Sequence, residues 1–191
     1  MMMMIKDLFI NLVVTISFFG VPQGPVEKFD PYNLNPTYKV KKMLTPASQE
    51  DLAKILCDSH VIEFGAPPTT NRLALSWAQV ALENNRGKKV WNNNLGNQGP
   101  FRMDQEYYHH LKRGWPYRSF NSLNESGVQY WKILKKCSMA LHAFDAGDAV
   151  TAATSLKKCN YYSSNEKQYS LTLNSLYYEA QARLLPKINC G

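Results

Sequence analysis

The feature that most constrains this chain is a mainly apolar run, Leu73–Leu82, that ends on Glu83. Its apolar side chains recur at helical spacing and fill two faces of a helix, with Leu73, Trp77, Val80 and Ala81 on one face and Ala74, Ala78 and Leu82 on the other. A helix that is apolar nearly all round has to be covered by other elements on every side. The run therefore predicts a central helix that carries an acid at its end.

Glu83 is expected to have chemistry that an exposed glutamate lacks. Apolar neighbours such as Val80 and Leu82 penalise the charged form of a carboxyl and so raise its pKa. The partial negative charge at a helix C-terminus acts in the same direction. A carboxyl that stays protonated near neutral pH can donate its proton to the leaving oxygen of a glycosidic bond. The alternative is an exposed side chain at a frayed helix end, and only the sequence after Glu83 separates the two.

Two helices are predicted before the loop region that follows Glu83. Thr45–Pro46 is a start signal, a hydroxyl cap and then a proline in the first turn, for a helix that stops at Gly65. Thr69 or Thr70 caps the helix that ends at Glu83. Residues 84–121 lack helical periodicity and are interrupted by glycine and proline. They predict a small irregular or β lobe.

The second half of the chain returns to helical patterns. Short strands are expected at Arg102–Tyr108 and Tyr117–Phe120. Further helices are expected at three places, from the capping box Ser122–Glu125 to about Phe144, from Asp148 to about Lys158, and over Asn165–Leu185. The fold class is therefore α+β and mainly α, with the small lobe inserted between helices.

Three blocks, in order, carry a resemblance to a known family. The first is Ala81–Gly87 followed by Asn93–Asn97, which is similar to an Ala-Leu-Glu-Ser…Gly segment and an Asn-Asn-Leu-Phe-Gly turn. The second, Tyr117–Ser126 with Tyr130, is similar to a Phe-Arg-x-Tyr-x-Ser-x-x-Glu-Ser…Tyr block. The third is Leu156–Tyr162 with Tyr169, which resembles a Gly-Tyr-x-Thr-Asp-Pro-x-Tyr segment.

Together these blocks resemble the glucosaminidases of bacterial autolysins and flagellar muramidases, glycoside hydrolase family 73. The resemblance implies a lysozyme-like helical domain, Glu83 as the general acid, and Tyr161 or Tyr162 facing the cleft beside it. It also implies that the substrate-binding residues include Asn94, Gly96, Asn97, Tyr117 and Tyr130. The chain departs from the pattern at Arg86, where an aromatic residue is usual, at the missing phenylalanine of the Asn-rich turn, and at Asn160, which replaces a glycine.

The second catalytic group stays open. Most glycosidases use two carboxylates, and the candidates after Glu83 are Asp104 and Glu106 in the expected small lobe. Solvated side chains on strands are the alternative for both. A site of this kind can also work with one carboxylate if the N-acetyl or 6-hydroxyl group of the sugar attacks instead.

The N-terminal region predicts two segments before the folded domain. One lysine followed by the apolar stretch Leu8–Phe19 is typical of a secretory signal, and an uncleaved anchor or an arm in a larger assembly remains open. We expect an apolar leader over residues 1–20, a proline-rich arm over 21–45, and the catalytic domain over 46–191. The protein is expected outside the cytoplasm, secreted or periplasmic, or in a virion.

Charge and cysteines narrow the class of partner. The net charge is +7, and residues 86–191 carry all of the excess, with 15 basic and 7 acidic side chains. Such a field favours anionic partners, but no nucleic-acid motif accompanies it, so nucleic acid is not expected. Cysteine spacing does not fit a metal site, and neither a metal nor another cofactor is expected. If the chain is exported, Cys137 and Cys159 are the first expected disulfide, with free thiols as the alternative.

Two functions from different classes fit these observations. The first is a peptidoglycan hydrolase, a glucosaminidase, muramidase or lytic transglycosylase, that cleaves β-1,4 bonds of the glycan strand through Glu83. The second is a non-catalytic structural or assembly subunit, for example of a phage particle, that keeps a lysozyme-like fold. Glu83 and its Asn-rich turn favour the first, while the leader and the proline-rich arm favour the second.

Overall fold

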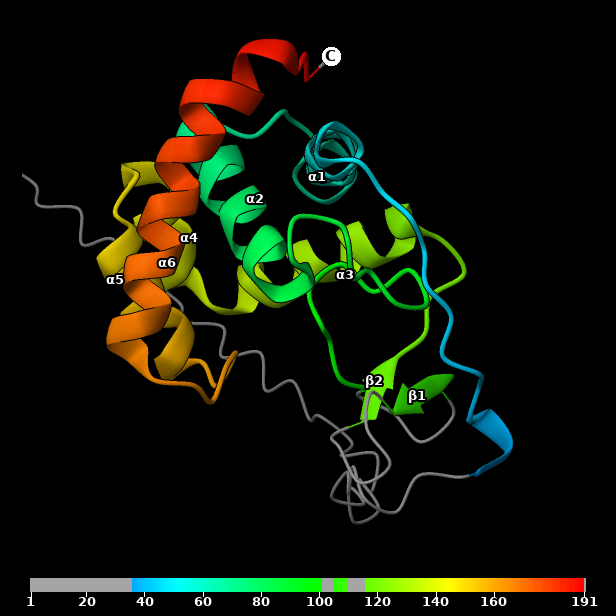
Figure 1. Ribbon diagram of the computed structural model, residues 1–191. Coiled ribbons are helices and arrows are strands. Elements are labelled where there is room, and N and C mark those ends of the chain that lie inside the picture. The colour runs from blue at the N-terminus through cyan, green and yellow to red at the C-terminus, as the bar shows by residue number, and fades with distance from the viewer. Residues whose placement is uncertain (1–35, 101–104, 110–115, 191) are drawn as a thin grey trace, which may run out of the picture.

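The computed structural model describes residues 36–100, 105–109 and 116–190 (Figure 1). The described chain is mainly helical, with one small antiparallel sheet, as the sequence predicts. The apolar leader, most of the proline-rich arm and Asp104 lie outside the described residues. None of the helices in the described part is long and apolar enough to cross a membrane.

Helix α2 (Thr70–Asn84) is the centre of the fold (Figure 1). Thr69 caps it by accepting a hydrogen bond from the Arg72 amide, and Asn85 ends it in the left-handed conformation. It packs against α1 (Gln49–Phe64), α4 (Ser138–Ala146) and α6 (Glu166–Glu179). Its Trp77 is completely buried. The prediction of a central helix over this run is confirmed.

Helix α1 begins later than predicted. Its cap is Ser48, whose hydroxyl accepts from the Asp51 amide while the Asp51 carboxylate accepts from the Ser48 amide. The expected cap, Thr45, lies outside the helix, and its amide donates to the Val90 carbonyl at 2.8 Å. The start signal at Thr45–Pro46 was therefore wrong, because a tertiary backbone contact engages Thr45 and the helix begins only after Ser48.

One predicted helix is two helices in the structure. Helix α3 (Leu123–Lys136) ends at Cys137, whose backbone leaves the helical region at φ −105° and ψ 64°, and α4 follows at once. Helix α3 packs mainly against α1. The cap at Ser122 forms as predicted, but the Glu125 carboxylate accepts from the Asn121 amide rather than from Ser122.

The C-terminal helices follow the predicted order. Asp148 caps α5 (Ala149–Lys158), and Asn165 caps α6. The last predicted helix does not stay α-helical to its end, since α6 passes into the π-helical turn η2 (Ala180–Leu184) and the 3-10 turn η3 (Leu185–Lys187). Helices α5 and α6 pack against each other on one side of α2 (Figure 1).

The small lobe is a two-stranded hairpin with the N-terminal arm beside it. Strand β1 (Tyr107–His109) pairs antiparallel with β2 (Pro116–Arg118), so the first strand lies at the end of the predicted range. The described part of the arm begins at the 3-10 turn η1 (Pro36–Tyr38), and the Val40 amide donates to the Tyr107 carbonyl at 2.9 Å. Further along, the arm runs beside residues 90–92.

Disulfides close the helical part at two places. Cys137–Cys159 joins the α3–α4 junction to the end of α5, which confirms the predicted pair. Cys57–Cys190 joins α1 to the C-terminal segment across 133 residues of sequence. All four cysteines are therefore oxidised.

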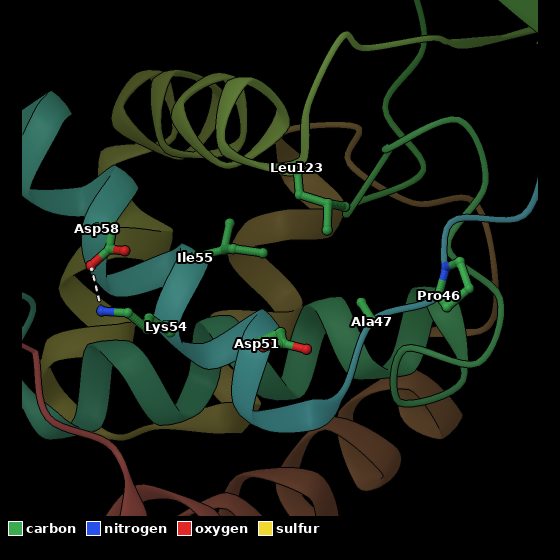
Figure 2. A pocket seen from close by; sticks show the side chains of 7 residues that line it. All are labelled: Pro46, Ala47, Asp51, Lys54, Ile55, Asp58 and Leu123. Atoms are coloured by element: carbon green, nitrogen blue, oxygen red, sulfur yellow. Dashed lines mark hydrogen bonds and ion pairs between the residues drawn. The ribbon is translucent and has the colours of Figure 1, made fainter.

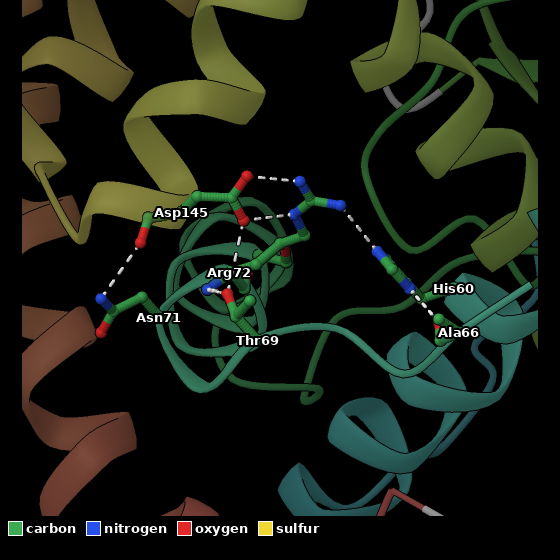
Figure 3. A network of polar contacts seen from close by, with 7 residues as sticks. His60, Ala66, Thr69, Asn71, Arg72 and Asp145 are labelled. Atoms are coloured by element: carbon green, nitrogen blue, oxygen red, sulfur yellow. Dashed lines mark hydrogen bonds and ion pairs between the residues drawn. The ribbon is translucent and has the colours of Figure 1, made fainter. Parts of the chain in front are cut away.

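A partly buried polar network joins α1, α2 and α4 (Figure 3). The Arg72 guanidinium donates to both carboxylate oxygens of Asp145, at 2.7 and 2.5 Å, and lies 3.0 Å from His60 Nε2. The other ring nitrogen of His60 lies 2.6 Å from the Ala66 carbonyl oxygen. Since the guanidinium only donates, Nε2 accepts and Nδ1 carries the proton, so His60 is neutral here.

Mild acid is expected to weaken the fold through His60. Burial, opposed by the bond to Ala66 and helped by Arg72, lowers the pKa of the ring below its usual 6.5. The unfolded chain then holds a proton that the folded chain does not, so this part of the stability is complete above pH 6.5 and is lost as pH falls through the lower folded pKa. The expected slope is at most about 1.4 kcal/mol per pH unit. Chemical denaturation of the wild type and of His60→Gln at several pH values from 6.5 downward measures this slope. An equal dependence of stability on pH in both proteins would show that His60 is not its source.

Candidate active site

Glu83 lies in the last turn of α2, half-buried, with a donor on each carboxylate oxygen. The side-chain amide of Asn97 donates to Glu83 Oε2 at 3.2 Å and to the Glu83 carbonyl oxygen at 2.8 Å. Asn97 therefore holds the Glu83 carboxylate close to the Glu83 backbone. The Tyr169 hydroxyl donates to Oε1 at 3.4 Å. Burial raises the pKa of the Glu83 carboxyl, and the bonds from Asn97 and Tyr169 oppose that rise in part.

Behind Glu83 lies a row of buried polar groups. Gln79 is one helical turn earlier on α2, on the same face, and is fully buried. Its Oε1 accepts from the Tyr130 hydroxyl at 2.7 Å, and its Nε2 has no hydrogen-bond partner among the described residues. Burial raises the pKa of the Tyr169 hydroxyl well above its usual value, and Glu83 and Tyr130 add to the rise. The phenols therefore stay neutral around the acid.

Tyr161 closes another side of the site. Its hydroxyl donates to the Gly96 carbonyl at 3.3 Å, and burial raises its pKa well above the usual value, with Tyr130, Glu83 and Tyr169 contributing. The turn approaches it closely, because a Cβ added to Gly96 would lie 2.6 Å from the Tyr161 hydroxyl oxygen. A methyl group at this position would therefore force Tyr161 to shift.

The Asn-rich turn is held by side chains. Asn92, Asn93 and Asn97 have positive φ angles of 47°, 57° and 49°, which asparagine tolerates better than most residues. Asn94 is fully buried, donates to the carbonyls of Gln98 and Arg118 at 2.8 and 2.9 Å, and accepts from the Gln98 amide. Its polar atoms are therefore used inside the protein, and it shapes the turn that carries Gly96 and Asn97.

The remaining sequence candidates lie in different places. Tyr117, on β2, is half-buried near Glu83, and burial followed by the charge of Glu83 raises its pKa. The Tyr162 ring stacks on Tyr169 with centroids 3.7 Å apart, while its hydroxyl donates to the Ala153 carbonyl, so it supports Tyr169 from behind. Glu106 is exposed, and no contact joins its carboxylate to Glu83. Asp104 lies outside the described residues.

Two residues of this site were not among the sequence candidates. Tyr169 contacts the carboxylate directly, although the third sequence block ends on it. Gln79 could have been found from its spacing, because a residue four before Glu83 lies on the same face of the helix. Its burial beside two tyrosines depends on α3 and α6, which the local sequence does not reveal.

Gly96→Ala is expected to displace Tyr161 and lower stability by about 1–3 kcal/mol, as for other overpacked cores. Thermal denaturation measures the loss. The matched background is Tyr161→Phe, which removes the oxygen that the new methyl group would meet. Gly96→Ala should lower stability clearly less in the Tyr161→Phe background than in the wild type. Equal losses of stability in both backgrounds would show that contact with the Tyr161 hydroxyl is not what disfavours alanine at this position.

A hollow of about 260 Å³ lies between α1 and the start of α3 (Figure 2), and Glu83 does not line it. It is lined by Pro46, Ala47, Asp51, Lys54, Ile55, Asp58 and Leu123. Its Lys54 and Asp58 form an ion pair at 3.5 Å, and its Asp51 accepts from the amide of Ser48, the cap of α1. These charged groups of the hollow therefore already have partners within the protein.

No family model matches the chain, and comparisons with curated proteins and with solved structures found no significant match. The inference of function therefore rests on the residues around Glu83.

Proposed function

We propose that the protein is a peptidoglycan hydrolase that cleaves β-1,4 glycosidic bonds of the glycan strand, with Glu83 as general acid. The observation that carries the proposal is the raised pKa of the Glu83 carboxyl, which lies among neutral tyrosines at the end of a core helix. Acid catalysis of glycoside cleavage needs a proton donor of this kind. The family resemblance of the three sequence blocks supports the same reaction.

The two donors on Glu83 assign its oxygens different roles. The Asn97 amide can only donate, so Oε2 stays an acceptor in both protonation states. The proton of the neutral acid therefore belongs on Oε1, where the Tyr169 hydroxyl can donate or accept. Once Oε1 has given up its proton, the same hydroxyl stabilises the new carboxylate.

The chemical step uses one protein carboxyl. Glu83 transfers its proton to the bridging oxygen, the bond from C1 to that oxygen breaks, and the leaving sugar departs as an alcohol. Water then supplies the hydroxyl at C1 and returns a proton to Glu83. We propose the acetamido oxygen of the sugar as the group that stabilises the positive charge at C1, since the step then needs no second protein carboxylate.

Purified cell wall provides the test. The wild type should clear a wall suspension and release soluble fragments, and mass spectrometry of the new ends identifies the bond as one after N-acetylglucosamine or one after N-acetylmuramic acid. An anhydro end would show attack by the 6-hydroxyl in place of water. Binding of wall without any release of fragments would reject hydrolysis and leave the non-catalytic subunit.

A further inference from the structure

We propose that the protein binds anionic phospholipid membranes through a lysine-rich surface formed by the arm and the loop after α2. This surface, called the lysine face, comprises Lys39, Lys41, Lys42, Lys88 and Lys89 with the neighbouring Met43 and Leu44. The inference goes beyond glycan cleavage and does not depend on it.

The two segments of the lysine face lie side by side. The Thr45 amide donates to the Val90 carbonyl, and the Asn92 amide donates to the Met43 carbonyl, both at 2.8 Å. Lys42 Nζ lies 3.8 Å from the centre of the Trp91 ring. These contacts place Lys42 of the arm beside the loop whose Lys88 and Lys89 directly precede Val90.

The two segments that form the lysine face carry no acidic side chain of their own, since residues 36–48 and 84–98 contain no aspartate or glutamate. None of the ion pairs within the described chain involves the five lysines of the face, whereas Arg86, in the same loop, is paired with Glu179 of α6. Unpaired like charges repel one another, and an anionic surface relieves that repulsion. Near such a bilayer each lysine contributes roughly a fivefold gain in affinity.

Exposed apolar side chains favour a lipid surface over a soluble polyanion. Met43 and Leu44 are 59% and 49% exposed and directly follow Lys41 and Lys42. A bilayer interface takes up apolar side chains next to its anionic headgroups, whereas a dissolved polyphosphate offers them nothing. The apolar stretch 8–19 also precedes the arm in the sequence, and stable membrane attachment needs two signals.

The arm of the lysine face and the helices next to Tyr161 and Tyr169 lie on different sides of α2 (Figure 1). Helices α5 and α6, which lead to Tyr161 and carry Tyr169, lie across α2 from the arm (Figure 1). The loop that carries Lys88 and Lys89 starts directly after the helix that carries Glu83. A membrane on the lysine face would therefore hold the site at a fixed orientation to the bilayer.

Vesicle co-sedimentation of the full-length chain tests the proposal, with phosphatidylcholine vesicles compared with phosphatidylcholine–phosphatidylglycerol vesicles. The wild type should prefer the anionic vesicles, and the preference should weaken with added salt. The variant Lys41→Gln/Lys88→Gln/Lys89→Gln should lose on the order of 100-fold in affinity for them. The matched control Lys132→Gln/Lys136→Gln/Lys158→Gln removes the same charge from exposed positions on α3 and α5 and should lose little. Equal melting temperatures establish that all variants are folded.

Three outcomes would overturn the proposal. Equal losses in the two triple variants would mean that only net charge matters, and equal binding to neutral and anionic vesicles would assign binding to the leader alone. The variant Met43→Ser/Leu44→Ser addresses the choice of a lipid surface. If it binds anionic vesicles as tightly as the wild type, and soluble polyglycerophosphate competes fully, the face is a general polyanion site.

Discussion

Replacing Glu83 by Gln is expected to lower the rate of wall cleavage by about 10²–10⁴-fold, the usual contribution of a general acid. Glutamine keeps an oxygen for the Asn97 amide and an N–H for Tyr169, so the geometry is preserved and only the transferable proton is lost. Binding to wall should persist. Initial rates of fragment release and a wall pull-down measure the two effects.

The same variant is expected to be more stable than the wild type at neutral pH. Burial raises the folded pKa of Glu83, so ionisation disfavours the folded state, and stability falls as pH rises from the unfolded value of 4.5 through the folded one. Each unit of the rise corresponds to about 1.4 kcal/mol that Glu83→Gln would recover above that range. The gain should vanish below pH 4.5, as thermal denaturation at several pH values would show.

Glu106→Gln is the matched control for Glu83→Gln. Its carboxylate is exposed and does not contact Glu83, so the rate should stay within about threefold and the stability within ~0.5 kcal/mol of the wild type. A fall in rate as large as that of Glu83→Gln would make Glu106 the second catalytic carboxylate. Activity retained by Glu83→Gln would remove Glu83 from the mechanism.

Loss of the Cys57–Cys190 disulfide is expected to have the largest effect on stability. It closes a loop of 133 residues, for which chain entropy gives about 5 kcal/mol, whereas Cys137–Cys159 closes one of 22 and gives about 3 kcal/mol. In a chain of this size each kcal/mol lowers the melting temperature by about 2–4 °C. Cys57→Ala/Cys190→Ala should therefore melt at least about 10 °C below the wild type.

The second disulfide serves as the internal comparison. The melting temperature of Cys137→Ala/Cys159→Ala should lie between those of the wild type and Cys57→Ala/Cys190→Ala. Reduction of both disulfides in the wild type should lower the melting temperature more than the loss of either disulfide alone. Differential scanning calorimetry gives all four values. A reversed order would show that the shorter loop, at the junction of α3 and α4, matters through native packing more than through chain entropy.

Much of the helical plan could be predicted because it depends on local signals. The caps at Thr69, Asp148 and Asn165 are short-range hydrogen bonds. The run before Glu83 is apolar on nearly all sides, so a helix formed by it has to be buried. The start of α1 was missed because a backbone bond from Thr45 to the distant Val90 overrides the local cap signal. The break at Cys137 has no breaker residue to announce it.

The candidate site divides in the same way. Glu83 and the Asn-rich turn could be placed because they follow each other in sequence, and Asn97 folds back on Glu83. The tyrosines could not be sorted, because Tyr161, Tyr162 and Tyr169 come from a distant segment whose orientation depends on the packing of α5 and α6. In the structure Tyr169 contacts Glu83, and Tyr162 stacks on the Tyr169 ring.

The arm has a consequence for how the protein opens. Its backbone bonds to Tyr107 in the hairpin and to Val90 in the loop after α2 join two segments that have little regular structure of their own. Amide hydrogen exchange should therefore show residues 39–45, 90–94 and 107 opening as one cooperative unit, with a lower free energy than α2. Release of that unit would loosen the Asn-rich turn while the helical core stays folded, so the site would lose its order before the protein melts.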